Sequence, residues 1–567
     1  MKKVIFLFAL FALPLAVLSQ IPDLESNETP TYHELIKLYE EIDATSDFVD
    51  MTTYGMTDAG YPLHLLLINK DKVFDPSKFD PNKVVFLINN GIHPGEPCGV
   101  NASLHIVEEM SKGINIPDNV ILAIIPAYNI GGMLNRGSHS RANQNGPEAY
   151  GFRGNAQNLD LNRDFIKADS KNAFAFYDIF QALKPHIFLD THTSNGSDYQ
   201  YTMTLITSQP EMAGSVIGPF AKHIMTPFLM KDMDKRDWPM APYVNTIKGT
   251  PDHGIADFPD SPRYSTGYTS LFNTLSFVSE THMLKPFADR VKSTYALIHS
   301  MTEFGDVKSE DIINLKNKAN ETAKKMRTYP LSWELDTNHF ENLSFRGYES
   351  AKVKSSVTTG ERLLYDRDQP FEKDIQYFNT YQVKTKVKQT QYYIIPQGWH
   401  KIIERLQKNN VNMTALDRDS SILVSSYHLG LFETRTNPFE GHYQHYNTNM
   451  DLKRHNQSFR KGDFVVKMDQ DCNKFIAAVL EPEATDSYFN WNFFDVILQQ
   501  KEWYSGYVFE DIAAKMIQDD PELKIAFDEE MKDPEFAINS RGQLYWLYQK
   551  SPHYEPIHRR YPVYRVD

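Results

Sequence analysis

Histidine and carboxylate side chains occur together in a Gly/Pro-rich turn near the start of the chain, where they could hold a metal ion. The stretch INNGIHPGEPCGVNASL places His93 three residues before Glu96, directly after an apolar run and before an expected helix. The stretch FLDTHTSNG places His192 at the end of another apolar run. Two imidazoles and one carboxylate leave the fourth position of a tetrahedral zinc ion open to water, as in a catalytic site. The alternative is that His93 and Glu96 form only a polar turn at the end of a strand.

Two more stretches add polar side chains of kinds found in catalytic sites. In NLDLNRDF, Asn162 stands beside Arg163, and together they form a fork of donors suited to a carboxylate. In LSFVSETH, Glu280 lies on an otherwise apolar strand, where an unpaired carboxylate is costly unless it has a purpose. Each residue also has a structural interpretation: a helix cap for Asn162 and Arg163, a hydrogen-bonded core position for His192, and an arginine partner for Glu280.

The His-x-x-Glu spacing is weak evidence on its own. The chain has 19 histidines and repeats the spacing at His105 and Glu108. Those two residues fall inside an expected helix, where polar neighbours at i and i+3 are common on the surface. His93 and Glu96 differ because they follow a buried strand, and ligands of open α/β sheets bind at the carboxyl ends of strands.

Apolar strands alternate with helices through the first part of the chain. The expected strands are residues 61–69, 83–91, 119–129, 186–193 and 275–282, and the expected helices are residues 97–112, 173–183, 285–304 and 308–327. Continuous apolar strands of this kind are buried on both faces. The pattern predicts an α/β domain over residues 25–328, with a mixed central sheet covered by helices on both faces.

The pattern changes beyond residue 330. Segments such as YQVKTKVKQTQYYIIP alternate with polar turns, and helices are expected only at residues 399–409 and past residue 506. Residues 330–567 are therefore predicted to form a second, β-rich domain of the α+β type. The role of this C-terminal domain is not indicated by its sequence.

In their order along the α/β domain, these motifs resemble those of the zinc carboxypeptidases, the carboxypeptidase A-like metallopeptidases. The shared order is His-x-x-Glu, Asp-Leu-Asn-Arg, a histidine at a strand end and a glutamate near the close of the domain. The resemblance implies that His93, Glu96 and His192 hold one Zn²⁺ ion and that Glu280 is the general base and acid. It also implies that Asp160 orients the first zinc histidine from behind.

The resemblance extends to the residues that would bind the substrate. Arg153 is similar in position to the family's arginine that polarises the scissile carbonyl, with Arg136 and Arg141 as alternatives. Asn162 and Arg163 match the pair that grips the terminal carboxylate of a peptide. The implied partner is a peptide substrate with a free C-terminal carboxylate.

The sequence departs from the family pattern at several positions. The family's Asn-Pro-Asp-Gly turn is here Asn129-Ile-Gly-Gly, and Asp164 replaces the second asparagine of Asn-Arg-Asn-Phe. The tyrosine that caps the substrate has two candidates, Tyr264 and Tyr268, and Arg263 is a candidate for a second substrate-binding cation. These departures concern the substrate pocket more than the zinc ligands.

The first residues, MKKVIFLFALFALPLAVLSQ, are typical of a secretory signal peptide over residues 1–19. The apolar run is too short for a membrane anchor, and no later run approaches the length that spans a bilayer. Cleavage would remove two lysines and change the formal charge from −14 to −16, which disfavours a nucleic-acid partner. The sequence predicts an exported protein, periplasmic or secreted, without a membrane span in the mature chain.

The predicted function is an exported zinc metallocarboxypeptidase that hydrolyses C-terminal peptide bonds with a zinc-activated water and a glutamate general base. The nearest alternative is a zinc amidohydrolase of the same fold that acts on N-acyl amino acids or peptidoglycan stem peptides. A second alternative is a binding protein with an inactive peptidase domain, although the presence of Glu280 argues against it. The side-chain preference and the oligomeric state are not indicated by the sequence.

Overall fold

The computed structural model describes residues 21–567, so the signal peptide predicted for residues 1–19 lies outside the described residues. By its internal contacts the chain divides into two compact units. The first extends to Thr322 and also includes Glu334–Gln382, and the second comprises Ala323–Trp333 and Val383–Asp567. The predicted domains, 25–328 and 330–567, differ from these units in the segments 323–328 and 334–382.

The first unit is built on a mixed sheet in the strand order β1-β2-β4-β3-β5-β10-β6-β7. Its strands are β1 (Val49–Met56), β2 (Pro62–Ile68), β3 (Val84–Asn89), β4 (Val120–Ile125), β5 (Ile187–Ser194), β6 (Met203–Thr207), β7 (Met240–Pro242) and β10 (Leu275–His282). Strands β4, β3, β5 and β10 run parallel, whereas β2 and β6 pair antiparallel to β4 and β10. Every strand expected from the sequence in this part of the chain is present.

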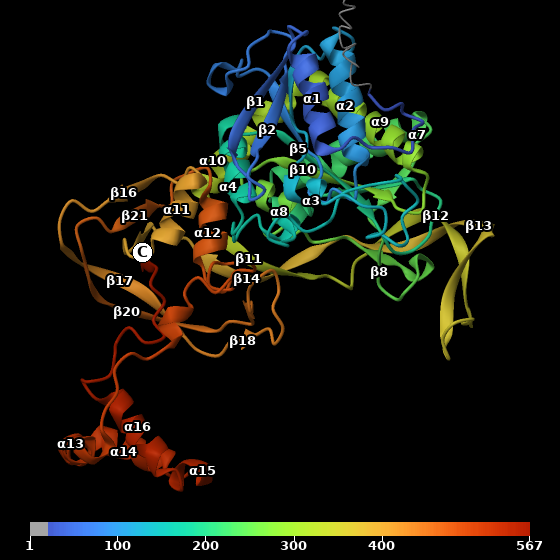
Figure 1. Cartoon of the computed structure of the whole chain (residues 1–567). Helices are drawn as coiled ribbons and strands as arrows, with labels where there is room; N and C mark the ends of the chain where they lie inside the picture. The colour runs from blue at the N-terminus through green and yellow to red at the C-terminus, as the bar shows by residue number, and fades with distance from the viewer. Residues whose placement is uncertain (1–20) are drawn as a thin grey trace, which may run out of the picture. The chain divides into compact units, whose positions relative to one another are not determined.

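Helices cover both faces of this sheet (Figure 1). They are α1 (Tyr32–Asp43), α2 (Cys98–Ser111), α3 (Ile130–Leu134), α4 (Lys171–Leu183), α5 (Pro210–Ala213), α6 (Ile217–Phe220), α7 (Thr226–Lys235), α8 (Ser265–Ser270), α9 (Phe287–Val307) and α10 (Ser309–Lys325). Phe86 and Ile88 of β3 join the core formed with α1, α2 and α9, whereas Phe188 of β5 packs on Phe176 of α4. Because alternate side chains meet helices on opposite faces, β3 and β4 are apolar along nearly their whole length.

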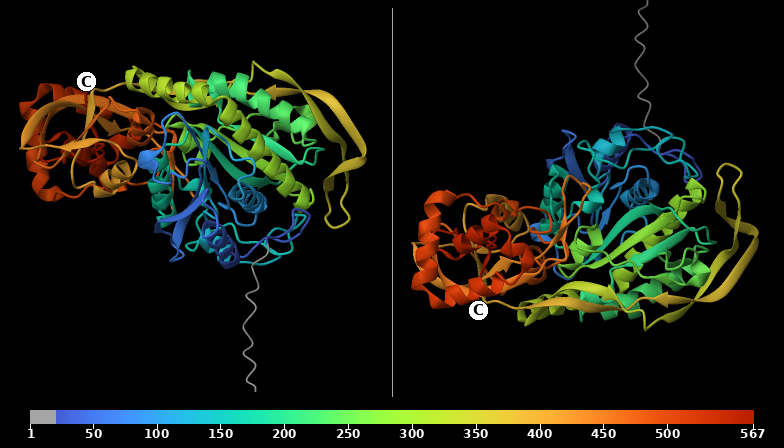
Figure 2. Two further views of the ribbon diagram at one scale, coloured as in Figure 1. Left: turned by 90° about the horizontal axis from the view of Figure 1, so that it is seen from above. Right: turned by 90° about the horizontal axis from the view of Figure 1, so that it is seen from below.

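A second sheet of the first unit, in the order β12-β13-β9-β8, supports the loop that follows β5. Its strands are β8 (Asn245–Thr246), β9 (Ile255–Ala256), β12 (Glu341–Lys354) and β13 (Glu361–Phe378), and Figure 2 shows β12 and β13 as a long two-stranded ribbon. Arg367 of β13 forms an ion pair with Asp198 at 2.6 Å. The side-chain amide of Gln200 donates to the carbonyls of Gly347 and Phe371, each at 2.9 Å. The ribbon therefore holds the chain directly after the end of β5.

The second unit contains an antiparallel sheet in the order β16-β21-β15-β22-β17-β20. Its strands are β15 (Tyr392–Ile395), β16 (Met413–Ala415), β17 (Ser420–Leu429), β20 (Met450–Phe459), β21 (Phe464–Lys467) and β22 (Tyr564–Val566). Two further pairs are β11 (Thr328–Leu335) with β14 (Tyr381–Lys388) and β18 (Glu433–Thr434) with β19 (His445–Tyr446). The predicted β-rich character of the C-terminal region is confirmed.

The helices of the second unit include one that the sequence did not predict. They are α11 (His400–Lys408), α12 (Asn473–Leu480), α13 (Gly506–Asp519), α14 (Pro521–Glu530), α15 (Pro534–Ala537) and α16 (Ser540–Lys550). The expectation of helices only at 399–409 and past 506 is therefore wrong at α12, where nearly every side chain is buried. A helix that is apolar all round lacks the polar face that gives a helical period. Among the described residues, no helix combines the length and the apolarity needed to cross a bilayer.

Candidate metal centre and active site

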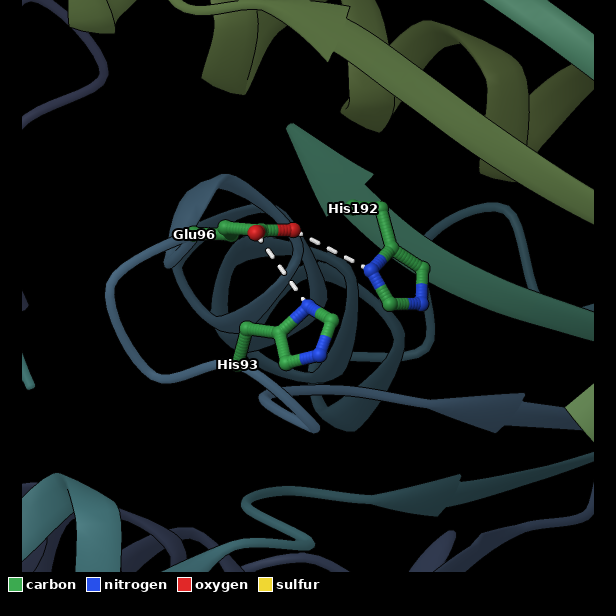
Figure 3. Close-up of side chains that lie close together, drawn as sticks. All are labelled: His93, Glu96 and His192. Carbon is green, nitrogen blue, oxygen red and sulfur yellow. Dashed lines mark hydrogen bonds and ion pairs between the residues drawn. The ribbon is translucent and has the colours of Figure 1, made fainter. Parts of the chain in front are cut away.

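The three predicted metal ligands meet at the carboxyl ends of two neighbouring parallel strands. His93 and Glu96 lie in the loop between β3 and α2, and His192 lies on β5, which pairs with β3. The Nδ1 atoms of His93 and His192 are 3.2 and 3.1 Å from the two carboxylate oxygens of Glu96 (Figure 3). One ligand atom from each residue falls within 4.8 Å of the others, and each residue is only 3% exposed.

The donor set fits a zinc ion because each imidazole is held from behind by a carboxylate. His93 Nε2 lies 3.0 Å from Asp160 Oδ1, and His192 Nε2 lies 3.0 Å from Asp190 Oδ2. A hydrogen bond at Nε2 fixes the tautomer that turns the Nδ1 lone pair toward a metal. Burial favours the neutral form of Glu96, but the positive charge of Arg141 and the two histidines hold its pKa well below the usual range. The set therefore offers two imidazole nitrogens and an ionised carboxylate.

Local packing fixes Glu96 against the strand of His192. The backbone N–H of Thr193 donates to Glu96 Oε2 at 2.8 Å. The second residue of α2, Gly99, meets β5 so closely that a Cβ atom there would overlap the side chain of Thr191. Only glycine lets α2 begin at this distance from β5, and this places the loop with His93 and Glu96 beside His192.

Asp190 is a positioning residue that the sequence analysis missed. It precedes His192 by two residues on β5, so both side chains face the same side of the sheet. Its Oδ2 atom also accepts a hydrogen bond from the hydroxyl of Ser265 at 2.5 Å. The Asp-x-His spacing on a buried strand is the signal that would have identified it.

We expect Asp190→Asn to weaken zinc binding by roughly 10–100-fold, the usual cost of losing a carboxylate behind a metal-bound histidine. The measurement is the zinc dissociation constant by competition with a chromophoric chelator. Glu109→Gln is the matched control, because Glu109 also bonds a histidine, His299, at 3.0 Å but does so between α2 and α9. Equal affinities for Asp190→Asn and the parent protein would contradict the role given to Asp190.

Glu280 lies on β10 directly beside His192. The two residues are partners in the parallel register of β10 and β5, and both line one cavity. Burial raises the pKa of Glu280 to about 8; the charge of His192 opposes this rise, and the charges of Glu96 and Asp190 add to it. A carboxylate that titrates near neutral pH beside a metal-ligand set is suited to general base catalysis.

The cavity has a volume of about 550 Å³ and gathers most of the predicted site residues. The predicted residues that line it are His93, Glu96, Arg141, Arg153, Asn162, Arg163, His192, Tyr264 and Glu280. Arg153 Nη2 pairs with Asp160 Oδ2 at 2.8 Å, and its Nη1 lies 3.8 Å from Glu96 Oε1. The guanidinium of Arg163 lies 4.4 Å from the centre of the Tyr264 ring.

Asp160 joins the first metal ligand to the arginines of the cavity. It bonds His93 and Arg153 and lies 4.0 Å from Arg163. Burial favours its neutral form, but these three partners hold the pKa of Asp160 well below its usual range. The predicted position of Asp160 behind His93 is the one observed.

Among the described residues, three of those predicted to contact the substrate do not line the cavity: Arg136, Arg263 and Tyr268. Arg136 instead donates to two backbone carbonyls of the N-terminal segment. Tyr268 is fully buried and stacks on Tyr177, with ring centroids 5.2 Å apart. Tyr264 is the N-cap of α8 and has an extended backbone, whereas Tyr268 lies inside the helix and packs on α4. Of the three side chains predicted on this segment, Tyr264 lines the cavity, whereas Tyr268 and Arg263 are not among its lining residues.

Two of the departures from the family motifs lie in turns with defined local contacts. The side-chain amide of Asn129 donates to the carbonyls of Ile92 and Arg153, at 3.1 and 2.9 Å, and so ties together two loops of the site. Asp164 is fully buried and accepts hydrogen bonds from Lys167 Nζ at 2.6 Å and the Ser170 backbone at 3.0 Å. Asp164 therefore shapes the turn after Arg163 and does not enter the cavity lining.

Several cavity residues escaped the sequence analysis. They include Asn143, Ser194, Tyr243, Phe258 and Asp260. Most lie in loops without a helical or strand period, and a loop residue carries no pattern that indicates which side of it faces a cavity. Ser194 is the exception, because it follows His192 by two residues on β5 and therefore shares its face.

The comparison with protein families agrees with this site. No curated protein sequence matches the chain, whereas residues 35–200 match the family model described as zinc carboxypeptidase. Similar solved structures include a metallo-carboxypeptidase from Burkholderia cenocepacia, with 16% identity, TM-score 0.37, and 49% of this chain and 69% of that chain covered. Another is carboxypeptidase A from Helicoverpa armigera, with 13% identity and a TM-score of 0.36. That comparison covers 51% of this chain and 74% of the other. The matched segment, residues 35–200, contains all three candidate ligands, His93, Glu96 and His192.

Proposed function

We propose that the protein is an exported zinc metallocarboxypeptidase that removes the C-terminal residue of a peptide. The match of residues 35–200 to the zinc carboxypeptidase family model supports a hydrolase of that family. The observation that carries the finer proposal is that one cavity holds the His93, Glu96 and His192 set together with the donors of Asn162 and Arg163. A metal site and a carboxylate-binding site in one cavity suit cleavage next to a free C-terminus.

His93, Glu96 and His192 would hold the zinc ion. Bound there, Zn²⁺ supplies an activated water and polarises the carbonyl of the substrate. Glu280 would take the proton from the attacking water and return it to the leaving amine, because its carboxylate borders the same cavity beside His192.

Two arginines, Arg141 and Arg153, border the ligand set. Their ion pairs and side-chain exposure indicate a different role for each. Arg141 is bonded to Glu96 and its side chain is only 13% exposed, so it serves to orient the ligand. Arg153 is 45% exposed, with its Nη1 3.4 Å from His93 Nδ1. Arg153 would therefore be the residue that reaches the oxyanion of the transition state.

Asn162 and Arg163 would hold the terminal carboxylate. The Arg163 guanidinium is oriented by the ring of Tyr264 and by its own hydrogen bond to the Asn162 carbonyl at 2.9 Å. An oriented guanidinium beside an amide suits the two oxygens of a carboxylate. The export of the protein to the periplasm or outside the cell rests on the signal-like sequence of residues 1–19.

The test of this function compares two peptides that differ only at the C-terminus. Amidation removes the negative charge that Arg163 would bind, so we expect kcat/KM to fall by roughly 10–100-fold or more relative to the free acid, as for loss of a charged hydrogen-bond partner. The measurement is release of the terminal residue, followed by mass spectrometry. Equal rates on both peptides would indicate an endopeptidase or another amidohydrolase instead.

A further inference from the structure

Arg141 lies directly against the turn that carries the first two candidate metal ligands, His93 and Glu96. Its guanidinium is bonded to Glu96, and its side chain lies against Gly95, the residue before it. A Cβ atom at Gly95 would come within 2.5 Å of Arg141 Nε and within 3.1 Å of the Gly151 carbonyl oxygen. Glycine at this position therefore leaves the space that the arginine side chain occupies.

A single glutamine, Gln144, holds both Arg141 and the ligand turn. Its side-chain oxygen accepts a hydrogen bond from Arg141 Nη1 at 2.9 Å, and its side-chain nitrogen donates to the Gly95 carbonyl at 2.8 Å. The same nitrogen donates to the Gly146 carbonyl at 3.1 Å. The partners require this orientation of the amide, because a guanidinium only donates and a carbonyl only accepts. Gln144 thus joins the arginine that contacts Glu96 to the backbone of the ligand turn.

The segment that carries these side chains, residues 141–146, is fastened at its far end by an arginine of α9. The Nη2 atom of Arg290 donates to the carbonyls of Asn145 and Gly146, each at 2.6 Å, and its Nε atom donates to the Lys285 carbonyl at 3.1 Å. Arg290 is fully buried, and among the described residues no carboxylate pairs with it. A buried charge is costly unless it is hydrogen-bonded, so these carbonyls fix the arginine and the arginine fixes the segment.

The segment 141–146 is also tied to the strand of the proposed base. The backbone N–H of Asn145 donates to the carbonyl of Met283 at 2.7 Å. Met283 directly follows β10, on which Glu280 lies, and both Met283 and Arg141 line the cavity. The segment therefore connects the ligand turn to the end of β10.

Glu96 is held on both of its carboxylate oxygens, and one of the two contacts depends on Gln144. The backbone N–H of Thr193 donates to Oε2 at 2.8 Å, whereas Arg141 contacts Oε1. Among the described residues, the Arg141 guanidinium has two hydrogen-bond acceptors, Glu96 and Gln144. Fixing a long side chain costs conformational entropy, so the bond to Gln144 favours the one geometry in which the arginine reaches Glu96.

We propose that Gln144 is a positioning residue of the metal centre. It fixes Arg141 on Glu96 and holds the backbone of Gly95 against the segment 141–146, so that the Glu96 carboxylate keeps the direction in which it binds zinc. The inference rests on the proposed zinc peptidase function and adds a residue that contacts none of the three ligand side chains. Gln144 is not among the residues that line the cavity, so its effect would be on the metal and not on the substrate.

The experiment measures the zinc dissociation constant of the full-length protein and of Gln144→Leu, by competition with a chromophoric chelator. Leucine is similar in size but neither donates nor accepts, so both the bond to the Arg141 guanidinium and the bond to the Gly95 carbonyl are lost. We expect the dissociation constant to rise by roughly 10–100-fold, the range for losing a hydrogen bond to a charged group or a partner behind a metal ligand. At saturating zinc, the KM for a free-acid peptide should stay within a few-fold of the parent value.

A second variant, Gln144→Glu, separates the two bonds of the side chain. Glutamate keeps an acceptor for Arg141 but has no donor for the Gly95 carbonyl. Its zinc dissociation constant should therefore lie between those of the parent protein and Gln144→Leu. Equal dissociation constants for the two variants would overturn the part assigned to Arg141.

Gln543→Leu is the matched control. The side-chain nitrogen of Gln543 also donates to two backbone carbonyls, those of Phe536 and Ala537, at 2.8 and 3.0 Å, but these carbonyls belong to the second unit of the chain. The control should bind zinc as tightly as the parent protein.

The outcomes distinguish the inference from the function on which it rests. If Gln144→Leu lowers the melting temperature of the zinc-free protein but keeps the zinc dissociation constant of the parent, Gln144 is only a structural residue and the inference is overturned. The proposed function would be unaffected by that result. A parent protein that binds no zinc overturns the proposed function itself.

Discussion

Glu280→Gln is expected to lower kcat by roughly 10²–10⁴-fold, the usual loss when a general base is removed. Glutamine keeps the size and hydrogen-bonding reach of the side chain but cannot accept a proton. Because Glu280 is not a metal ligand in this assignment, the variant should still bind one zinc ion and the peptide. The measurements are zinc content by atomic emission, kcat on a free-acid peptide and the inhibition constant of a non-hydrolysed analogue.

Ser279→Ala provides a control on the same strand. Ser279 precedes Glu280 on β10, so its side chain faces the other side of the sheet. Its buried hydroxyl has no hydrogen-bond partner among the described residues, and removing it should leave kcat within a few-fold of the parent value. A Glu280→Gln protein that turns over normally, or that loses zinc, would exclude Glu280 as the base.

The pH dependence of the parent enzyme follows from the same carboxylate. A general base acts in its ionised form, so kcat/KM should rise with pH through the pKa of Glu280. Without metal, burial places this pKa at about 8, and a bound cation lowers it by favouring the charged form. The apparent pKa at which kcat/KM rises on the acidic side of the profile should therefore be below 8.

His192→Ala is expected to abolish stoichiometric zinc binding and, with it, peptide hydrolysis. The change removes one of three ligands and leaves Glu96 and Asp190 without the imidazole that both contact. Two ligands rarely hold zinc in competition with water and buffer. The measurement is the zinc content after dialysis, together with activity after zinc is added back.

His105→Ala is the matched control for this loss. His105 belongs to the second His-x-x-Glu pair of the chain and lies on α2. Its Nε2 atom is 2.9 Å from the carbonyl oxygen of Pro22. Its removal should leave one zinc ion per chain. If His192→Ala also kept one zinc ion per chain while its circular dichroism spectrum was unchanged, the ligand assignment would be wrong.

The sequence by itself determined the central sheet and predicted the three residues that the structure brings together as candidate metal ligands. Runs such as Val84–Asn89 and Val120–Ile125 are apolar on both faces, and only a sheet covered on both faces buries such runs. Polar residues that interrupt or follow these runs, such as His93, His192 and Glu280, had to lie where strands end or at a buried site. Their chemistry and order were local properties that the sequence displays directly.

Only the tertiary structure decided which loop residues complete the cavity. Tyr264 and Tyr268 are equivalent in sequence terms, and the position of α8 alone turns one toward the cavity and the other onto Tyr177. Asp257 and Asp260 lie in one loop, three residues apart, yet of these two only Asp260 lines the cavity. The physical reason is that loops have no repeating period, so the direction of their side chains is set by distant packing partners that the sequence does not bring together.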